Sequence, residues 1–231
     1  MKKPYIKKIE TISKFNVWIV DGQYVRTKID EEFTNFGQHY RFKFIPKNEF
    51  WIDRESAPGE AKFFIDHMLV ENRLMAEGKS YAVAIERADV LEKKERNKSA
   101  IVKRWKGREA RDIVENKVHK KLLKKYSKDL KVWVVSGEAV RDFFRIDFTE
   151  GGHDMVYSFV PAREVWLDDD LSIKERKFVL LHEVHERHLM AKGWTYNDAH
   201  RDSSKIEFYC RHHRKALDKK IEQEIEKNKI I

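Results

Sequence analysis

Residue types that bind metal ions are concentrated in one stretch of the chain. On a helix, His182, His185 and Glu186 fall at positions i, i+3 and i+4, on one stripe. Glu186 lies seven residues before Gly193 and His200 seven residues after it, so two antiparallel helices joined there would set Glu186 beside His200. His182 lies one turn away, and His185 lies at the margin. Imidazoles and carboxylates bind divalent metals, so we predict one such site, preferably for Zn²⁺, with a fourth position open for water.

The same stretch resembles the HExxH helix of the zincin metallopeptidases, with Glu186 in the place of the second histidine. The resemblance implies that His182 binds the metal and that Glu183 is the general base for a metal-bound water. It also implies peptide hydrolysis as the reaction, with His200 completing the ligand set. A wider pattern resembles a family of small bacterial and phage proteins; it consists of Gly151-Gly152-His153, Glu164-x-Trp166-x-Asp168, His182-Glu183-x-x-Glu186 and Ala199-His200.

Two further residues of this pattern have candidate roles. His153 follows two glycines, where the backbone can approach a ligand closely, and is a candidate catalytic residue that binds substrate or donates to an oxyanion. The alternative is a solvent-exposed histidine in a turn. Asp168, at the end of its expected strand, could accept a hydrogen bond from a metal-binding histidine and so orient its ring. Equally, Asp168 and its counterpart Asp53 could cap the loop that follows.

The chain contains an internal duplication. A shift of 115 residues aligns 15–89 with 130–204 without a gap, with 25 identities in 75 positions. The first copy retains His67 and Glu71, but it is degenerate elsewhere. Its residues Gln38, Met68, Val70, Arg73 and Ile85 stand where the second copy has His153, Glu183, His185, His188 and His200. We therefore predict the metal site in the second copy only. The alternative is that both His–Glu pairs are buried hydrogen-bonded pairs that fix the helices.

Each copy is predicted to begin with strands and to end with two helices. The expected elements of the second copy are extended runs over 131–135, 139–148, 155–160 and 164–168, and helices over 172–192 and 195–210. Ser172 and Glu175 have the spacing of a capping box, and Gly193 suits the end of the first helix. We therefore predict an α+β fold, a tandem duplication of a small antiparallel β-sheet plus a helical hairpin.

A basic segment separates the two copies. The predicted domains are a first repeat (1–96), a basic helical connector (97–129), a second repeat (130–216) and a charged helical tail (217–231). The connector contains 12 basic and 4 acidic residues, and its apolar residues over 108–126 have the spacing of one amphipathic helix. The side chains that could contact nucleic acid are Lys103, Arg104, Lys106, Arg108, Lys120, Lys121, Lys124 and Lys125. The alternative is a solvated helix face without a partner.

Composition restricts the class of protein. The 231 residues include 48 Lys and Arg against 39 Asp and Glu, a formal charge of +9. Cys210 is the single cysteine, which favours a reducing, cytoplasmic compartment. No apolar run approaches the ~20 residues of a membrane-spanning helix, so no membrane association is expected. The leading hypothesis is a metal-dependent hydrolase acting on a peptide or protein. The alternatives are a metal-dependent nuclease and a non-enzymatic module, of viral or phage type, that binds nucleic acid or protein.

Overall fold

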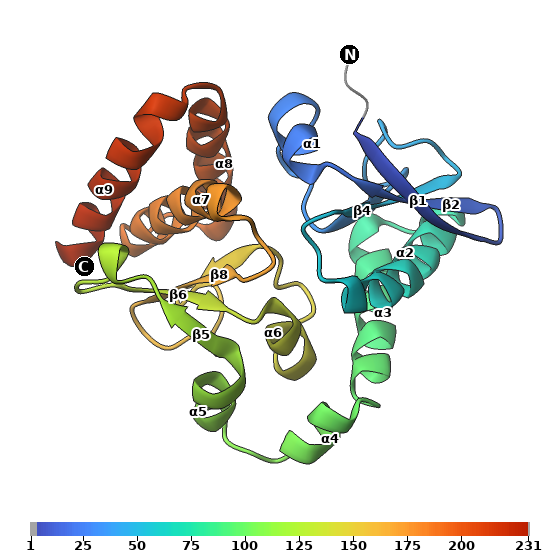
Figure 1. The fold of residues 1–231 in the computed structure, drawn as a ribbon, viewed down its shortest axis with the longest axis horizontal. Helices are drawn as coiled ribbons and strands as arrows, with labels where there is room; N and C mark the ends of the chain where they lie inside the picture. Colours follow the sequence, from blue (N-terminus) through green and yellow to red (C-terminus); the bar gives the residue numbers. More distant parts are fainter. Residues whose placement is uncertain (1–3, 231) are drawn as a thin grey trace. The chain divides into compact units, whose positions relative to one another are not determined.

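The computed structural model describes residues 4–230 and divides the chain into two compact units (Figure 1). Unit 1 comprises Met1–Gly107 and Arg141–Asp147, and unit 2 comprises Arg108–Val140 and Phe148–Ile231. Each unit contains one four-stranded sheet and a pair of long helices. The predicted α+β duplication is therefore confirmed.

The four strands, the short helix between the second and third of them, and the two long helices follow the same order in the two halves of the chain. Up to Gly107, they are β1 (Tyr5–Ile12), β2 (Phe15–Val20), α1 (Gly22–Lys28), β3 (Phe36–Gln38), β4 (Glu49–Asp53), η1 (Pro58–Glu60), α2 (Ala61–Ala76), α3 (Tyr81–Arg96) and α4 (Ala100–Trp105). After it, they are α5 (Ala110–Ile113), η2 (Val114–Val118), β5 (His119–Leu122), η3 (Lys124–Tyr126), β6 (Lys131–Val135), α6 (Gly137–Phe143), β7 (Gly151–His153), β8 (Glu164–Asp168), α7 (Ile173–Ala191), α8 (Tyr196–His212), η4 (Arg214–Ala216), α9 (Leu217–Lys227) and η5 (Asn228–Ile230).

The two sheets have the same topology. The strand order is β1-β2-β4-β3 in unit 1 and β5-β6-β8-β7 in unit 2. The registers also match, since Trp18 pairs with Trp51 in one sheet and Trp133 with Trp166 in the other. In both sheets the central pair of strands is parallel and the outer pairs are antiparallel, so each sheet is mixed rather than wholly antiparallel. A parallel pair needs a crossover connection, and the chain between the two central strands provides it.

The run 139–148, predicted as extended, instead begins inside helix α6, and the run 155–160 forms turns between β7 and β8 rather than a strand. The helix starts at Gly137, as α1 starts at Gly22 in the first copy. A Cβ atom on either glycine would lie 1.8 Å from the carboxylate of Asp168 or Asp53 respectively. The aspartate at the end of the central strand therefore packs against the first residue of the helix. This contact between distant residues is not visible in the local hydrophobic pattern.

The prediction of one continuous helix over 108–126 is wrong in its second half. After α5 and the π-helical turn η2, the chain forms β5, in which His119 pairs with Val135 and Leu122 with Trp133 of β6. Pairing with another strand satisfies backbone groups that a local helix would have paired internally. Val118 is one of the apolar residues whose spacing suggested a helix. It is the last residue of η2 and is fully buried in unit 2.

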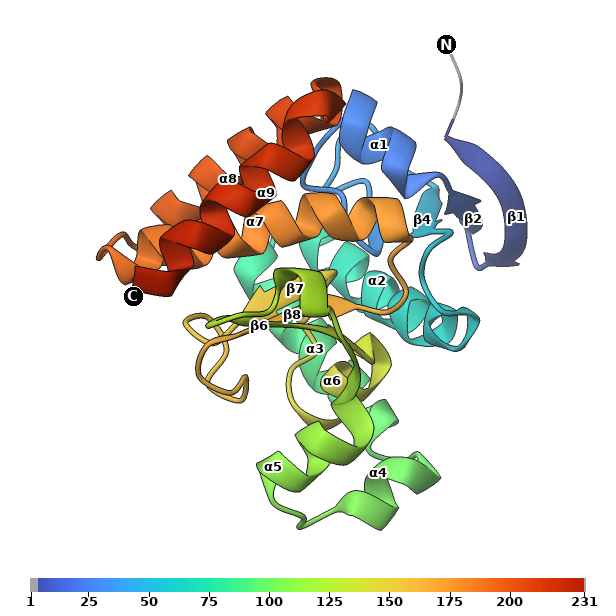
Figure 2. The ribbon, with the colours of Figure 1, turned by 60° about the vertical axis from the view of Figure 1, so that its left-hand side comes forward.

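Helix α7 is central to unit 2. The Oγ atom of Ser172 accepts a hydrogen bond from the backbone N–H of Glu175 at 3.3 Å, and Gly193 follows the helix with φ +90°, as their spacing predicted. The helix contacts β7 and β8 on one side and α8 and α9 on the other (Figures 1 and 2). Its residues can therefore reach both helices and the sheet.

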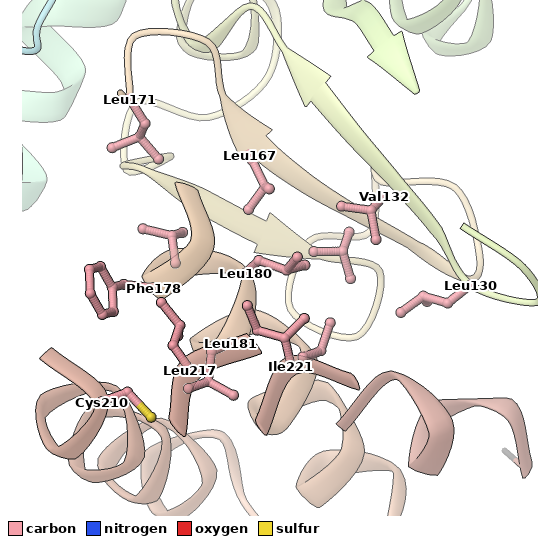
Figure 3. Packing of buried hydrophobic residues seen from close by; sticks show 13 residues of the cluster. Leu130, Val132, Leu167, Leu171, Phe178, Leu180, Leu181, Cys210, Leu217 and Ile221 are labelled. Carbon is pink, nitrogen blue, oxygen red and sulfur yellow. The ribbon is translucent and has the colours of Figure 1, made fainter. Parts of the chain in front are cut away.

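Apolar side chains from sheet and helices fix α7 in this position (Figure 3). Val132 and Leu167 come from the sheet, Phe178 and Leu181 from α7, and Ile221 from α9, and all are buried. Full burial of such a side chain stabilises a protein by about 1.5–3 kcal/mol. Cys210 is buried in the same cluster, where it packs as an apolar residue.

Within residues 4–230, no helix combines the length and the apolar character that crossing a membrane requires.

Candidate metal centre

Three potential ligand atoms converge between α7 and α8. Nε2 of His182 lies 3.1 Å from Nδ1 of His200 and 3.5 Å from Oε2 of Glu186, and the last two atoms are 2.8 Å apart. Ligand atoms at about 2.0–2.2 Å from a tetrahedral Zn²⁺ lie about 3.3 Å from one another. The spacing therefore fits a divalent ion, and the group opens to solvent at His200, whose side chain is 35% exposed.

Glu207 fixes the orientation of His182. Nδ1 of His182 donates to Oε2 of Glu207 at 3.0 Å, so in the neutral ring Nε2 has no proton and is directed at the other potential ligands. Glu207 pairs in turn with Arg211, which also pairs with buried Glu175. Burial alone would raise the pKa of Glu207, but Arg211 and His182 lower it to about 2. A carboxylate behind a ligating imidazole is a common feature of metal sites.

This network was not predicted from the sequence, although the duplication contains its signal. Glu92 and Arg96 stand 115 residues before the glutamate and arginine of unit 2, just past the end of the aligned segments. In unit 1, Nδ1 of His67 lies 2.9 Å from Oε2 of Glu92, and Arg96 pairs with Glu92 at 2.8 Å. The His–Glu–Arg network is therefore present in both units.

His153 is fully buried, which excludes the alternative of an exposed turn histidine. Its Nε2 lies 3.1 Å from Oε1 of Glu186, and its Nδ1 accepts a hydrogen bond from the backbone N–H of Met155 at 3.2 Å. Since Nδ1 accepts, the proton of the neutral ring is on Nε2, which donates to Glu186. His153 therefore orients Glu186 through this hydrogen bond. Burial alone would raise the pKa of Glu186, but the three histidines around it hold that pKa well below its usual range.

Glu183 is buried on α7, and its carboxylate lies within 4.8 Å of that of Glu186. A Cβ atom on Gly151 would lie 3.0 Å from its Oε1 and 2.8 Å from Cγ1 of Val179. The glycine before Gly152 and His153 therefore makes room for this carboxyl group. Burial, and then the charge of Glu186, raise the pKa of Glu183. A carboxyl group with a raised pKa can take up and release a proton closer to neutral pH, as a general base must.

Two residues of the predicted site have other partners. Nε2 of His185 lies 3.0 Å from Oδ2 of Asp202, and its Nδ1 faces α9 rather than the candidate metal centre. Oδ1 of Asp168 accepts a hydrogen bond from the backbone N–H of Asp170 at 3.0 Å, and its carboxylate packs against Gly137. These contacts are those of a residue that caps a loop.

Unit 1 keeps only part of the arrangement. Nε2 of His67 lies 3.8 Å from Oε2 of Glu71. The side-chain amide of Gln38 donates to Oε1 of Glu71 at 3.0 Å, as His153 does to its glutamate in unit 2. Ile85 stands where the second copy has His200. Two of the three potential ligands are therefore present in unit 1.

The basic residues predicted to contact nucleic acid are divided between the units. Unit 1 contains Lys103, Arg104 and Lys106, and unit 2 contains Arg108, Lys120, Lys121, Lys124 and Lys125. All of them are exposed. Lys120 pairs with Asp169 at 2.6 Å, which reduces the charge it offers to a phosphate. Within a single unit, the largest set of these exposed basic residues is therefore the group of lysines on β5 and η3.

Comparisons of the chain with protein-family models, with curated proteins and with solved structures found no match.

Proposed function

We propose that unit 2 is a hydrolase centred on a divalent metal ion, preferably Zn²⁺, held by His182, Glu186 and His200. The observation that carries this proposal is the convergence of one ligand atom from each side chain, all within 3.5 Å of one another. Two imidazoles and a carboxylate are a ligand set of catalytic zinc sites, which keep a further position open for water.

With both imidazoles neutral, a hydrogen-bonded network without metal accounts for these distances less well. Nδ1 of His200 lies close to both Nε2 of His182 and Oε2 of Glu186. A single proton on that Nδ1 can point at only one of the two atoms, and a buried acceptor left without a donor costs free energy. A cation between the three atoms interacts with all of them at once.

The residues around the proposed metal site have separate roles. A bound divalent ion would lower the pKa of a water molecule and polarise the oxygen of the bond to be cleaved. Glu183, next to His182 in the chain, accepts the proton of the attacking water and returns it to the leaving group, as its place in the zincin-like stretch implies. Glu207 keeps Nε2 of His182 free of a proton, and His153 holds the carboxylate of Glu186.

Peptide bonds are the proposed substrate class, because the order His182-Glu183 on α7 resembles the zincin helix. Phosphodiesters are the second candidate, favoured by the exposed lysines of β5 and η3 in the same unit. Lysines that neutralise phosphates make binding strongly dependent on salt, whereas peptide binding need not be. An assay with both substrate classes separates the two candidates.

Replacement of the general base tests the mechanism. Glu183→Gln should retain zinc and fold but lose activity by about 10²–10⁴-fold, the usual contribution of a general acid–base group. Cleavage of unstructured peptides and of single- and double-stranded nucleic acids is measured with the zinc-loaded protein. Glu222→Gln, at an exposed position on α9, is the matched control and should cleave at the parent rate. Equal rates for the parent and Glu183→Gln would contradict the mechanism, and a zinc-loaded parent that cleaves nothing would contradict the hydrolase.

A further inference from the structure

A second group of metal-binding side chains lies between α7 and α9. It consists of His185, His188 and Glu224, which are 8%, 4% and 2% exposed. Oε2 of Glu224 lies 3.1 Å from Nδ1 of His185 and 3.2 Å from Nδ1 of His188. These distances are again close to the spacing of about 3.3 Å between ligands of a tetrahedral ion.

The hydrogen bonding of His185 leaves one nitrogen in an unfavourable environment. Its Nε2 donates to Oδ2 of Asp202 at 3.0 Å, so Nδ1 of the neutral ring carries a lone pair. That lone pair faces the carboxylate of Glu224, and among the described residues Nδ1 has no hydrogen-bond partner of acceptable geometry. A buried acceptor opposite a carboxylate is costly unless a positive charge is present, either as a second proton on the imidazole or as a cation between the two groups.

The two groups of ligands are separate. In the first group, Glu186 receives hydrogen bonds from β7 and α8, whereas in the second group Glu224 belongs to α9. Oε1 of Glu224 is occupied by Lys227 at 2.7 Å, which leaves Oε2 as the atom shared by the two imidazoles. Figures 1 and 2 show α9 alongside α7, and the two helices are in contact. An ion bound here would connect these helices directly.

We propose that His185, His188 and Glu224 form a second divalent-cation site, suited to Zn²⁺, that fastens α9 to α7. Asp202 orients His185 in this site as Glu207 orients His182 in the first one. The site is specific to unit 2, since Val70 and Arg73 stand at the positions of the two histidines in the first copy. The proposal does not depend on hydrolase activity.

Zinc titration of the metal-free protein tests the proposal. The parent should bind about two zinc ions per chain, and His188→Ala should bind one, with affinity at the second site reduced by at least about 100-fold. Glu186→Gln should lose the other ion and keep this one. His212→Ala, at an exposed position at the end of α8, is the control and should bind two. If His188→Ala binds as many ions as the parent at unaltered affinities, the second site is refuted. If Glu186→Gln binds as the parent does, the first site fails while the second stands.

A measurement that needs no substitution in the second site keeps the test decisive if His188→Ala does not fold. Zinc added to the Glu186→Gln variant should slow hydrogen exchange of backbone amides in α9, because opening of that helix would break the ligand set. Addition of Mg²⁺, which prefers oxygen ligands, should not have this effect. Exchange in α9 that zinc leaves unaltered would overturn the proposal and would leave His185 as a proton-bearing ion pair between two carboxylates.

Discussion

The carboxylate behind His182 offers a test in which the protein provides its own control. Glu207→Gln keeps a side chain of the same shape but removes the charge that holds the proton on Nδ1 of His182. Glu92→Gln makes the same change in unit 1, where His67 and Arg96 have the equivalent contacts and the third ligand is missing. Comparison of the two variants separates an effect on zinc binding from an effect on folding stability.

The expected magnitudes follow from these contacts. Loss of a group that orients a ligating histidine weakens metal binding by about 10–100-fold, or about 1.4–2.8 kcal/mol. Both variants also leave a buried arginine with one charged partner fewer, and breaking such a pair costs up to about 3–5 kcal/mol of folding stability. We therefore expect similar destabilisation in Glu207→Gln and Glu92→Gln, and weaker zinc binding in Glu207→Gln alone.

Zinc affinity is measured by competition with a chromophoric chelator, and stability by urea unfolding of the metal-free variants. The comparison is valid for variants that remain folded at the temperature of the zinc titration. Zinc affinity that is equal in Glu207→Gln and the parent would refute the role of Glu207 behind His182. Zinc affinity that falls equally in both variants would show that the loss comes from general destabilisation.

Three further predictions concern other parts of unit 2. His200→Ala should weaken zinc binding without lowering the thermal stability of the metal-free protein, because the ring is partly exposed; a large drop in melting temperature with unaltered affinity would contradict this. The pKa of Glu207 is lowered from 4.5 to about 2, so its contribution to folding stability is complete above pH 4.5 and is lost as the pH falls through about 2. Urea unfolding of the metal-free protein should therefore show a loss of stability at acid pH. The Glu207→Gln variant should lack this pH dependence. Nucleic-acid binding, measured by fluorescence anisotropy, should be salt-sensitive and should weaken when Gln replaces the basic residues of β5 and η3; binding that these changes leave unaltered would contradict a role for Lys120, Lys121, Lys124 and Lys125.

Capping residues and helical spacing, which depend on nearby residues only, were sufficient to predict α7, α8 and the contact between their side chains. The spacing from Ser172 to Glu175 and the position of Gly193 depend on neighbouring residues, which the sequence displays directly. Counting seven residues in each direction from Gly193 then placed Glu186 beside His200, because a short antiparallel hairpin allows little freedom.

Features that depend on distant partners were not predictable in the same way. The strand β5 exists because His119 and Leu122 pair with β6, and nothing in the segment itself distinguishes it from a helix with a similar apolar spacing. The role of Glu207 depends on which residue of α8 lies opposite His182, and Glu207 lies about two helical turns beyond His200, the last residue of the recognised pattern. The capping role of Asp168 required the position of Gly137, which only the parallel pairing of the central strands defines.

Both copies retain a His–Glu pair, His182–Glu186 and His67–Glu71, so one carboxyl group occurs twice in this chain under opposite electrostatic conditions. In unit 2, the histidines lower the pKa of Glu186. In unit 1, Gln38 offers a neutral amide instead, and burial raises the pKa of Glu71. The degenerate copy thus keeps its glutamate closer to the protonated state, in which it needs no counter-ion.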